Sequence, residues 1–139
     1  MNRFLPLLFL LPLCLYAQPD TDIFLLEVNQ KGDLLTFSNP KNITPRKGYD
    51  NQPSFTPDGS ALLYVSALSD GQTEVYRYDL ARGTSQRLTN TKKRSEFSPA
   101  VTPDGKYMSA VVVEEDSSQR IWKYPISGGN GERITDKLE

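Results

Sequence analysis

The chain has 139 residues, enough for one modest domain at typical domain sizes of roughly 100 to 200 residues. It contains no histidine and a single cysteine, Cys14, so the residue types of most zinc sites and nucleophilic triads are missing beyond the apolar start. Sixteen basic and seventeen acidic residues give a formal net charge of −1, which provides no general attraction to nucleic acid or to an anionic membrane.

Residues 1–17 have the pattern of a secretory signal peptide. A basic residue, Arg3, precedes an apolar run from Phe4 to Tyr16, and the small residue Ala17 follows it. As a helix this run spans about 20 Å, short of the roughly 30 Å of a bilayer core, which argues against a permanent membrane span. Leu13 is too bulky for a lipidation signal at Cys14. We therefore expect an exported protein with no integral membrane segment once the leader is removed.

Residues 22–44 are predicted to form two strands. Asp22 to Val28 is the first apolar stretch, and Leu34 to Phe37 follows after a longer connection through Gly32. The segment ends in Ile43-Thr44, a pair that recurs as Leu88-Thr89 at the end of the first complete repeat described next. It therefore corresponds to the second half of that repeat only.

A repeat with a period of 46 residues dominates the rest of the chain. Asn51 to Asn90 aligns without a gap on Phe97 to Asp136. In both copies a Thr-Pro-Asp-Gly sequence comes early, an aromatic-basic-tyrosine sequence lies in the middle, and Arg-Leu-Thr or Arg-Ile-Thr comes at the end. A period in the forties built of short strands is the sequence signature of a propeller blade.

Each copy predicts four antiparallel strands. The first strand is short and precedes a turn in which Gly59 or Gly105 takes positive φ, where a side chain would be strained. The third strand carries aromatic residues on one face, because side chains two apart point the same way. The predicted first, second and third strands are Phe55-Thr56, Ala61–Ala67 and Glu74–Leu80 in the first copy, and Val101-Thr102, Tyr107–Val113 and Arg120–Ile126 in the second; the fourth strands end at Thr89 and Thr135.

These motifs resemble the WD-repeat-like blades of the TolB-like β-propellers. The resemblance rests on Pro-x-x-[Thr/Ser]-Pro-Asp-Gly, on [Val/Ile]-[Tyr/Trp]-x-Tyr and on Arg-[Leu/Ile]-Thr, and it covers nearly all of residues 21–139. It implies an all-β fold, a partial β-propeller of about two and a half four-stranded blades within residues 18–139. The parts are an outer half-blade over 22–44 and blades over 51–90 and 97–136.

A ring of four to eight such blades needs well over 139 residues, so we expect the chain to be the front part of a longer product. In that product a last repeat would supply inner strands beside Ile23 to Val28. The isolated chain is expected to be marginally stable or to aggregate, because each blade buries its faces only against its neighbours.

The resemblance implies an exported, non-catalytic scaffold in the periplasm or cell envelope that binds a protein or peptide partner. No cofactor, metal or nucleic-acid ligand is predicted. An alternative remains open, since the same blades occur in larger enzymes: the chain could be the propeller portion of, for example, a serine peptidase whose catalytic domain lies elsewhere. A longer reading frame would separate the two. The sequence indicates no oligomeric state.

The two loops that join successive blades carry the candidate partner-binding residues. Each loop presents basic residues followed by an acid, at an offset of 46, and a ring of positive charge could receive an acidic peptide or an anionic glycan. The alternative is ordinary solvated loop charge. The candidate residues are Arg46, Lys47, Tyr49, Lys92, Lys93 and Arg94.

Three further motifs favour structural interpretations. The acidic run Glu114-Glu115-Asp116 is contiguous rather than alternating, so solvated charge is favoured over a calcium site, and it would offset the basic loops. Gly83–Arg87 approaches the nucleophile-elbow pattern but lacks its closing glycine, and there is no histidine to act as base. The aromatic-basic-tyrosine sequences recur at the blade period, which favours packing between sheets over base stacking. No catalytic residue is predicted.

Overall fold

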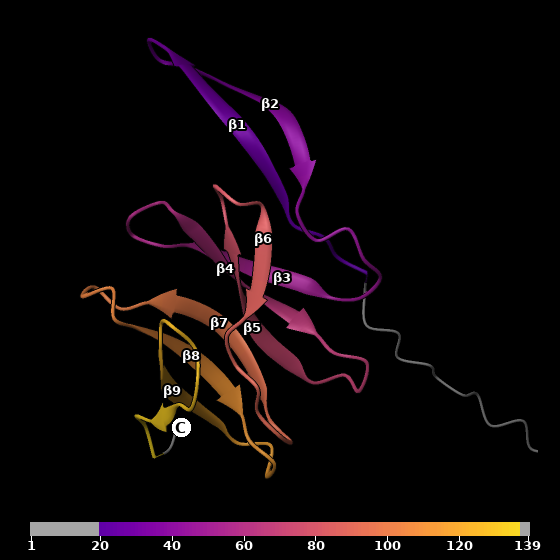
Figure 1. Ribbon diagram of the computed structural model, residues 1–139, viewed down its shortest axis with the longest axis vertical. Coiled ribbons are helices and arrows are strands. Elements are labelled where there is room, and N and C mark those ends of the chain that lie inside the picture. The colour runs from indigo at the N-terminus through magenta and orange to yellow at the C-terminus, as the bar shows by residue number, and fades with distance from the viewer. Residues whose placement is uncertain (1–19, 137–139) are drawn as a thin grey trace, which may run out of the picture.

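The computed structural model describes residues 20–136, so the predicted signal peptide at 1–17 lies outside the described residues. The chain in this range forms ten strands and the connections between them (Figure 1). The strands are β1 Phe24–Lys31, β2 Leu34–Asn42, β3 Asp50–Phe55, β4 Ala61–Ala67, β5 Thr73–Asp79, β6 Thr84–Arg87, β7 Ser95–Val101, β8 Tyr107–Val113, β9 Gln119–Pro125 and β10 Glu132–Arg133.

These strands form three antiparallel sheets. β1 and β2 make a hairpin, and the other two sheets have the orders β3-β4-β5-β6 and β7-β8-β9-β10. Equivalent strands of the two larger sheets pair in equivalent registers, for example Tyr64 with Tyr76 and Ala110 with Trp122, 46 residues later. The prediction of an all-β fold with two repeated four-stranded units is therefore confirmed. We call the sheet of β3–β6 blade 1 and the sheet of β7–β10 blade 2.

Apolar residues pack the sheets face to face. Leu63, Val75 and Leu88 of blade 1 meet four buried residues of blade 2, namely Met108, Ala110, Val112 and Tyr124. On the other face of blade 1, Leu62, Tyr64 and Tyr78 pack against Ile23 and Ile43, at the base of the hairpin. β4 is thus covered on both faces and buried along its whole length, whereas β8, with a neighbour on one side, alternates between buried and half-buried residues.

The Thr-Pro-Asp-Gly turns have the same geometry in both blades. The Thr56 hydroxyl donates to Asp58 Oδ1 at 2.6 Å, and the Thr102 hydroxyl donates to Asp104 Oδ1 at 2.6 Å. Gly59 and Gly105 follow with φ of +67° and +69°, the left-handed values that the sequence predicts there. The turns fix the start of β4 and β8.

A threonine near the end of each hairpin holds the preceding strand. The side-chain oxygen of Thr89 accepts the backbone N–H of Val75 at 2.8 Å, and that of Thr135 accepts the N–H of Ile121 at 2.9 Å. Thr44 does the same for Ile23 at 2.9 Å. We call these three interactions the threonine clasp. The same interaction thus occurs at the base of the β1–β2 hairpin and at the end of each four-stranded sheet.

Two details of the hairpin and the first strands differ from the prediction. The connection between β1 and β2 is a tight turn at Gly32-Asp33, not a longer loop, because both strands extend well past their apolar stretches. The first strands are also longer than predicted and begin at Asp50 and Ser95. A β-bulge in each, with Gln52 and Ser98 at φ of +55° and +50°, accommodates the proline that follows, at the sheet edge where proline is tolerated.

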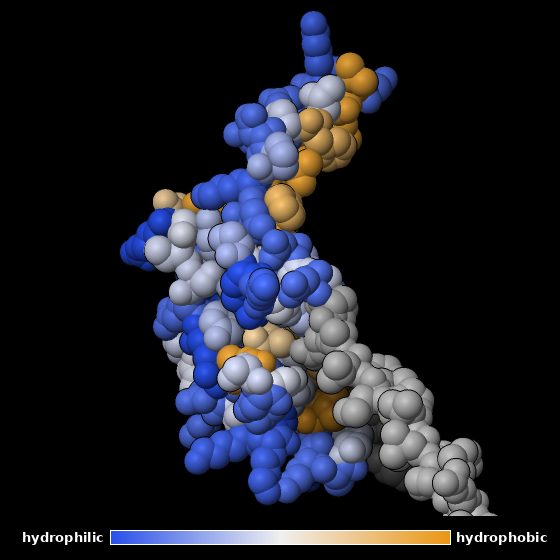
Figure 2. All heavy atoms as spheres, turned by 90° about the vertical axis from the view of Figure 1, so that its right-hand side faces the viewer, coloured by the Kyte–Doolittle hydropathy of each residue, from blue (hydrophilic) through white to orange (hydrophobic). Residues whose placement is uncertain are grey.

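One face of the β1–β2 hairpin is apolar and exposed. Val28 lies directly opposite Phe37, and Leu35 points to the same side because it is two residues from Phe37. All three side chains are more than half exposed, and Figure 2 shows apolar residues in a line along this hairpin. We call Val28, Leu35 and Phe37 the hairpin stripe.

Candidate functional site

The candidate partner-binding residues lie at one end of the blades, which we call the loop end. It comprises the connections between sheets, residues 43–49 and 88–94, and the β4–β5 and β8–β9 connections at 68–72 and 114–118. Two contacts bring these connections together: the Arg46 guanidinium donates to the carbonyl of Ala67 at 3.0 Å, and the N–H of Arg94 donates to Gln72 Oε1 at 3.1 Å. The loop end is thus formed jointly by successive sheets.

Arg46 forms an ion pair with a buried carboxylate. Its Nη2 lies 2.8 Å from Oδ1 of Asp50, whose side chain is fully buried, and it also contacts the hydroxyl of Ser66. A buried carboxylate needs such a partner, because its desolvation is costly. Arg46 therefore serves the interior of the fold, and the acid of this loop motif is a strand residue of β3 instead of solvated loop charge.

The second loop is neutralised by the acidic run. Lys93 Nζ lies 2.6 Å from Glu115 Oε1, in an exposed pair. The Arg94 guanidinium lies over the Trp122 ring, 4.3 Å from its centroid, and the indole N–H of Trp122 donates to Glu114 Oε1 at 2.9 Å. The offset of the basic loops by this acidic run is as the sequence predicts, but Glu114 is half-buried and structural.

Lys47 and Lys92 remain exposed at the loop end, one in each connection between sheets. Among the polar contacts of residues 20–136, neither side chain has a carboxylate partner within ion-pair distance. Tyr49, in the same connection as Lys47, is half-buried, and its carbonyl accepts the N–H of Ala67 at 2.8 Å. Of the six candidates, Lys47 and Lys92 are therefore the ones whose charge faces solvent without an internal role.

A buried pair of carboxyl groups, Glu74 and Glu96, lies beneath the second loop, and sequence reasoning placed Glu96 in a solvated loop. Both residues have no exposed surface. Glu96 Oε1 accepts the hydroxyls of Thr91 and Tyr124 at 2.9 and 3.1 Å, and Glu74 Oε1 accepts from Arg87 at 2.7 Å. Burial first, and then repulsion by Glu74, raises the pKa of Glu96 to about 7.

The repeat contained a partial signal for this pair. Asp50 and Glu96 align at the offset of 46, so an acid recurs at the start of each first strand. Only the stacking of the blades shows that both are buried and that blade 1 supplies a second acid, Glu74, against Glu96. The pair consists of two acids, and residues 20–136 contain no group of three or more histidine, cysteine or acidic residues that could hold a metal ion.

No family profile and no curated protein matches the chain. Among solved structures it is similar to a putative TolB from Agrobacterium tumefaciens, with a TM-score of 0.62 and 24% identity over 74% of this chain and 37% of that one. TolB from Acinetobacter baumannii gives 0.56 and 24% over 85% and 33%. The fold is that of a TolB-like β-propeller. The resemblance found in the sequence is thereby confirmed for the fold.

The chain spans about a third of the length of these TolB structures. A putative 6-phosphogluconolactonase from Bacteroides uniformis is also similar, at 16% identity over 83% of this chain and 34% of that one, but its TM-score of 0.43 is too low to support an argument. The antiparallel four-stranded sheets fit a partial propeller of this kind. Within residues 20–136 no helix is long and apolar enough to cross a membrane.

Proposed function

We propose that this protein is an exported, non-catalytic propeller scaffold that binds a protein or peptide partner in the periplasm or cell envelope. The TolB-like fold supports the proposal, since the sequence resemblance to those blades implies such a role. The composition supports it too. The chain lacks histidine and has its one cysteine at position 14, so the common nucleophile–base pairs are missing beyond that residue.

The partner is proposed to bind at the loop end. This location is supported by the different roles of the basic residues there. Arg46 and Arg94 make contacts within the fold, whereas Lys47 and Lys92 present their charge to solvent. Exposed basic side chains on a rigid β scaffold steer and orient an acidic peptide more than they add affinity. An acidic peptide segment of a larger protein is therefore the proposed ligand.

Photo-crosslinking tests the location of the partner. A photoreactive residue at position 47 or 92 is expected to capture a defined envelope protein in living cells. The matched control is position 106, because Lys106 is also an exposed lysine but follows the Asp-Gly turn at the other end of blade 2. Adducts from position 106 alone, or from none of the three, would contradict the proposal.

Charge reversal tests the contribution of the lysines. K47E with K92E is expected to weaken binding of the captured partner about tenfold at low salt and less at 0.5 M salt, since exposed pairs contribute about 0.2 to 1 kcal/mol each and are screened. Unchanged affinity at low salt would contradict the electrostatic part. A reading frame that continues into a Gly-x-Ser-x-Gly segment with a downstream histidine would contradict the non-catalytic part.

A further inference from the structure

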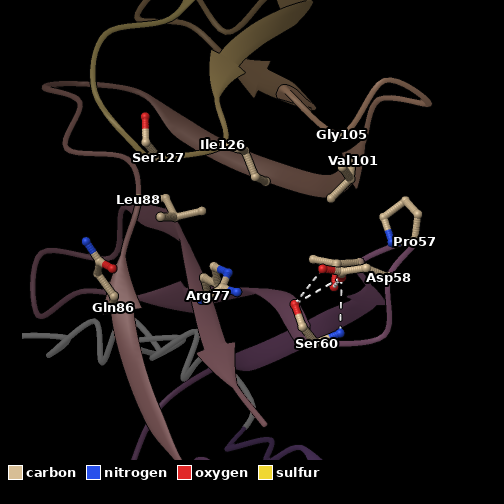
Figure 3. Close-up of a pocket in the computed structure, with 11 residues that line it drawn as sticks. Pro57, Asp58, Ser60, Arg77, Gln86, Leu88, Val101, Gly105, Ile126 and Ser127 are labelled. Atoms are coloured by element: carbon tan, nitrogen blue, oxygen red, sulfur yellow. Dashed lines mark hydrogen bonds between the residues drawn. The ribbon is translucent and has the colours of Figure 1, made fainter. Parts of the chain in front are cut away.

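A cavity of about 540 Å³ lies between blade 1 and blade 2 and extends from Leu88 to the end opposite the loop end (Figure 3). It is opposite because β4 starts beside this cavity, at the Thr56–Ser60 turn, and finishes at Ala67, which contacts Arg46. The second turn contributes Gly105, and the β9–β10 connection contributes Ser127. Its volume falls within the range of small-molecule sites, roughly 300 to 1,000 Å³.

One side of the cavity is apolar. Leu88, Val101 and Ile126 line it, and Figure 3 shows these three side chains around the same space. Leu88 belongs to the inter-blade core, against which Val101 and Ile126 pack. These residues are therefore held in place by the stacking of the two blades, and they offer a preformed surface for an apolar group.

Arg77 supplies a positive charge on the other side. Its side chain is only 27% exposed, and its nearest carboxylate oxygen, Oδ2 of Asp79, is 3.5 Å from Nη1. Asp79 is already bound by Arg82 at 3.2 Å and by two backbone N–H groups. Within the described range Arg77 makes no other polar contact, so most of its donors are available to a ligand.

Blade 2 shows what the same position looks like when its charge is neutralised. Lys123, the equivalent of Arg77 at the offset of 46, lies 2.6 Å from its cross-strand neighbour Glu132. In blade 1 the cross-strand neighbour of Arg77 is Gln86, which also lines the cavity. The counter-ion of blade 2 is thus replaced by a neutral amide in blade 1.

Asp58, the one acid among the described residues that line the cavity, is engaged elsewhere. Asp58 Oδ1 accepts from Thr56 and from the N–H of Ser60, at 2.6 and 3.1 Å, and Oδ2 accepts the Ser60 hydroxyl at 2.9 Å. These bonds hold the pKa of Asp58 at about 2. Asp58 therefore completes the turn and does not pair with Arg77, whose one carboxylate contact in the described range is the 3.5 Å contact to Asp79.

We propose that this cavity is a second binding site, for a carboxylate attached to an apolar group. Arg77 binds the carboxylate, for which its planar guanidinium offers two parallel donors, and the apolar group lies against Leu88, Val101 and Ile126. The Gln86 amide and the Ser127 hydroxyl lie within the same wall and can orient the ligand. A small free carboxylate and a peptide C-terminus both have this chemistry.

The direct test is titration of the full chain with N-acetyl-leucine, followed by the methyl NMR signals of Leu88, Val101 and Ile126. A Kd of about 1 mM is expected for a ligand of this size, together with shifts of these three residues. N-acetyl-leucinamide, which has the same apolar group without the charge, should bind at least tenfold more weakly. Equal binding of the amide, or shifts confined to other residues, would overturn the proposal.

Gln86→Glu rebuilds the blade 2 ion pair in blade 1 and should weaken binding at least tenfold by occupying Arg77. Gln119→Glu is the matched control, because it makes the same substitution at an exposed position at the other end of β9 and should leave the affinity unchanged. Equal Kd values for Q86E and the unsubstituted chain would overturn the proposal. A leucine-ended peptide that binds tenfold tighter than N-acetyl-leucine assigns the site to peptide termini, and equal affinity assigns it to small carboxylates.

Discussion

The buried pair of Glu74 and Glu96 makes stability depend on pH in a direction opposite to that of most carboxylates. Burial and repulsion by Glu74 raise the pKa of Glu96 from its ordinary 4.5 to about 7, so the folded state binds a proton that the unfolded state releases. The protonated form therefore stabilises the fold below pH 4.5, and this contribution is lost as the pH rises from about 4.5 to about 7. At ~1.4 kcal/mol per pKa unit the loss is about 3 kcal/mol.

The groups around Glu96 allow its effect on stability between about pH 4.5 and 7 to be measured. Arg87 neutralises Glu74, Tyr124 donates to Glu96, and Arg94 lies nearby over Trp122. Hydrogen bonds lower the pKa values of the turn and loop aspartates, so the stability that these aspartates contribute is lost only in more acidic solution. Because the chain has no histidine, no such side chain titrates between pH 5 and 8 and obscures the effect.

Urea unfolding of the unsubstituted chain and of Glu96→Gln at pH 5, 6, 7 and 8 tests this, followed by fluorescence of the one tryptophan, Trp122. The unsubstituted chain should lose about 3 kcal/mol of unfolding free energy across this range, whereas E96Q should stay nearly constant. Glu115→Gln, in an exposed pair, should keep the original slope. Stability that is constant or rises from pH 5 to 8 in the unsubstituted chain would contradict this role of Glu96, as would an unchanged slope in E96Q.

Three pairs of substitutions test the remaining predictions, two on stability and one on self-association. Arg46→Ala should cost about 2 kcal/mol in urea unfolding because it leaves the Asp50 carboxylate buried without its partner, whereas Lys92→Ala, at the equivalent position, should change the unfolding free energy by less than about 0.5 kcal/mol. Thr89→Val should cost about 1 to 3 kcal/mol by leaving a buried N–H without an acceptor, and Thr89→Ser, which keeps the hydroxyl, should recover most of it. The 139-residue chain should self-associate through the hairpin stripe, so Phe37→Lys should reduce association in sedimentation velocity while Thr36→Lys, on the other face, should not. A sharp thermal transition of a soluble monomer of the unsubstituted chain would contradict the last expectation.

The repeat was enough to predict the blades because it combines two signals that agree. Turn residues such as Gly59 occur where the chain must take positive φ, and the apolar run of β4 has the length of a buried strand. The first strands are harder to predict, because Pro53 and Pro99 interrupt them. The amino-acid composition does not reveal the bulges that accommodate these prolines.

The sequence predicts where the basic loops lie, but it predicts the role of each basic residue only in part. The offset of 46 identifies the basic loops. Whether a basic side chain is solvated or pairs with a buried group depends on the residues that the neighbouring sheet packs against the loop. Arg46 meets the buried Asp50, whereas Lys92, its equivalent, faces solvent. Sequence spacing does not show which residues of a neighbouring sheet pack against a loop.

The threonine clasp anchors the base of a hairpin in the same way whatever the length of the hairpin. Thr44 reaches back across 21 residues to Ile23, yet Thr89 and Thr135 make the same bond across 14. The tip of the outer hairpin can therefore vary in length while its base stays anchored. The Gly32-Asp33 turn is accordingly the place to graft an epitope tag or a fluorescent reporter with the least disturbance to the blades.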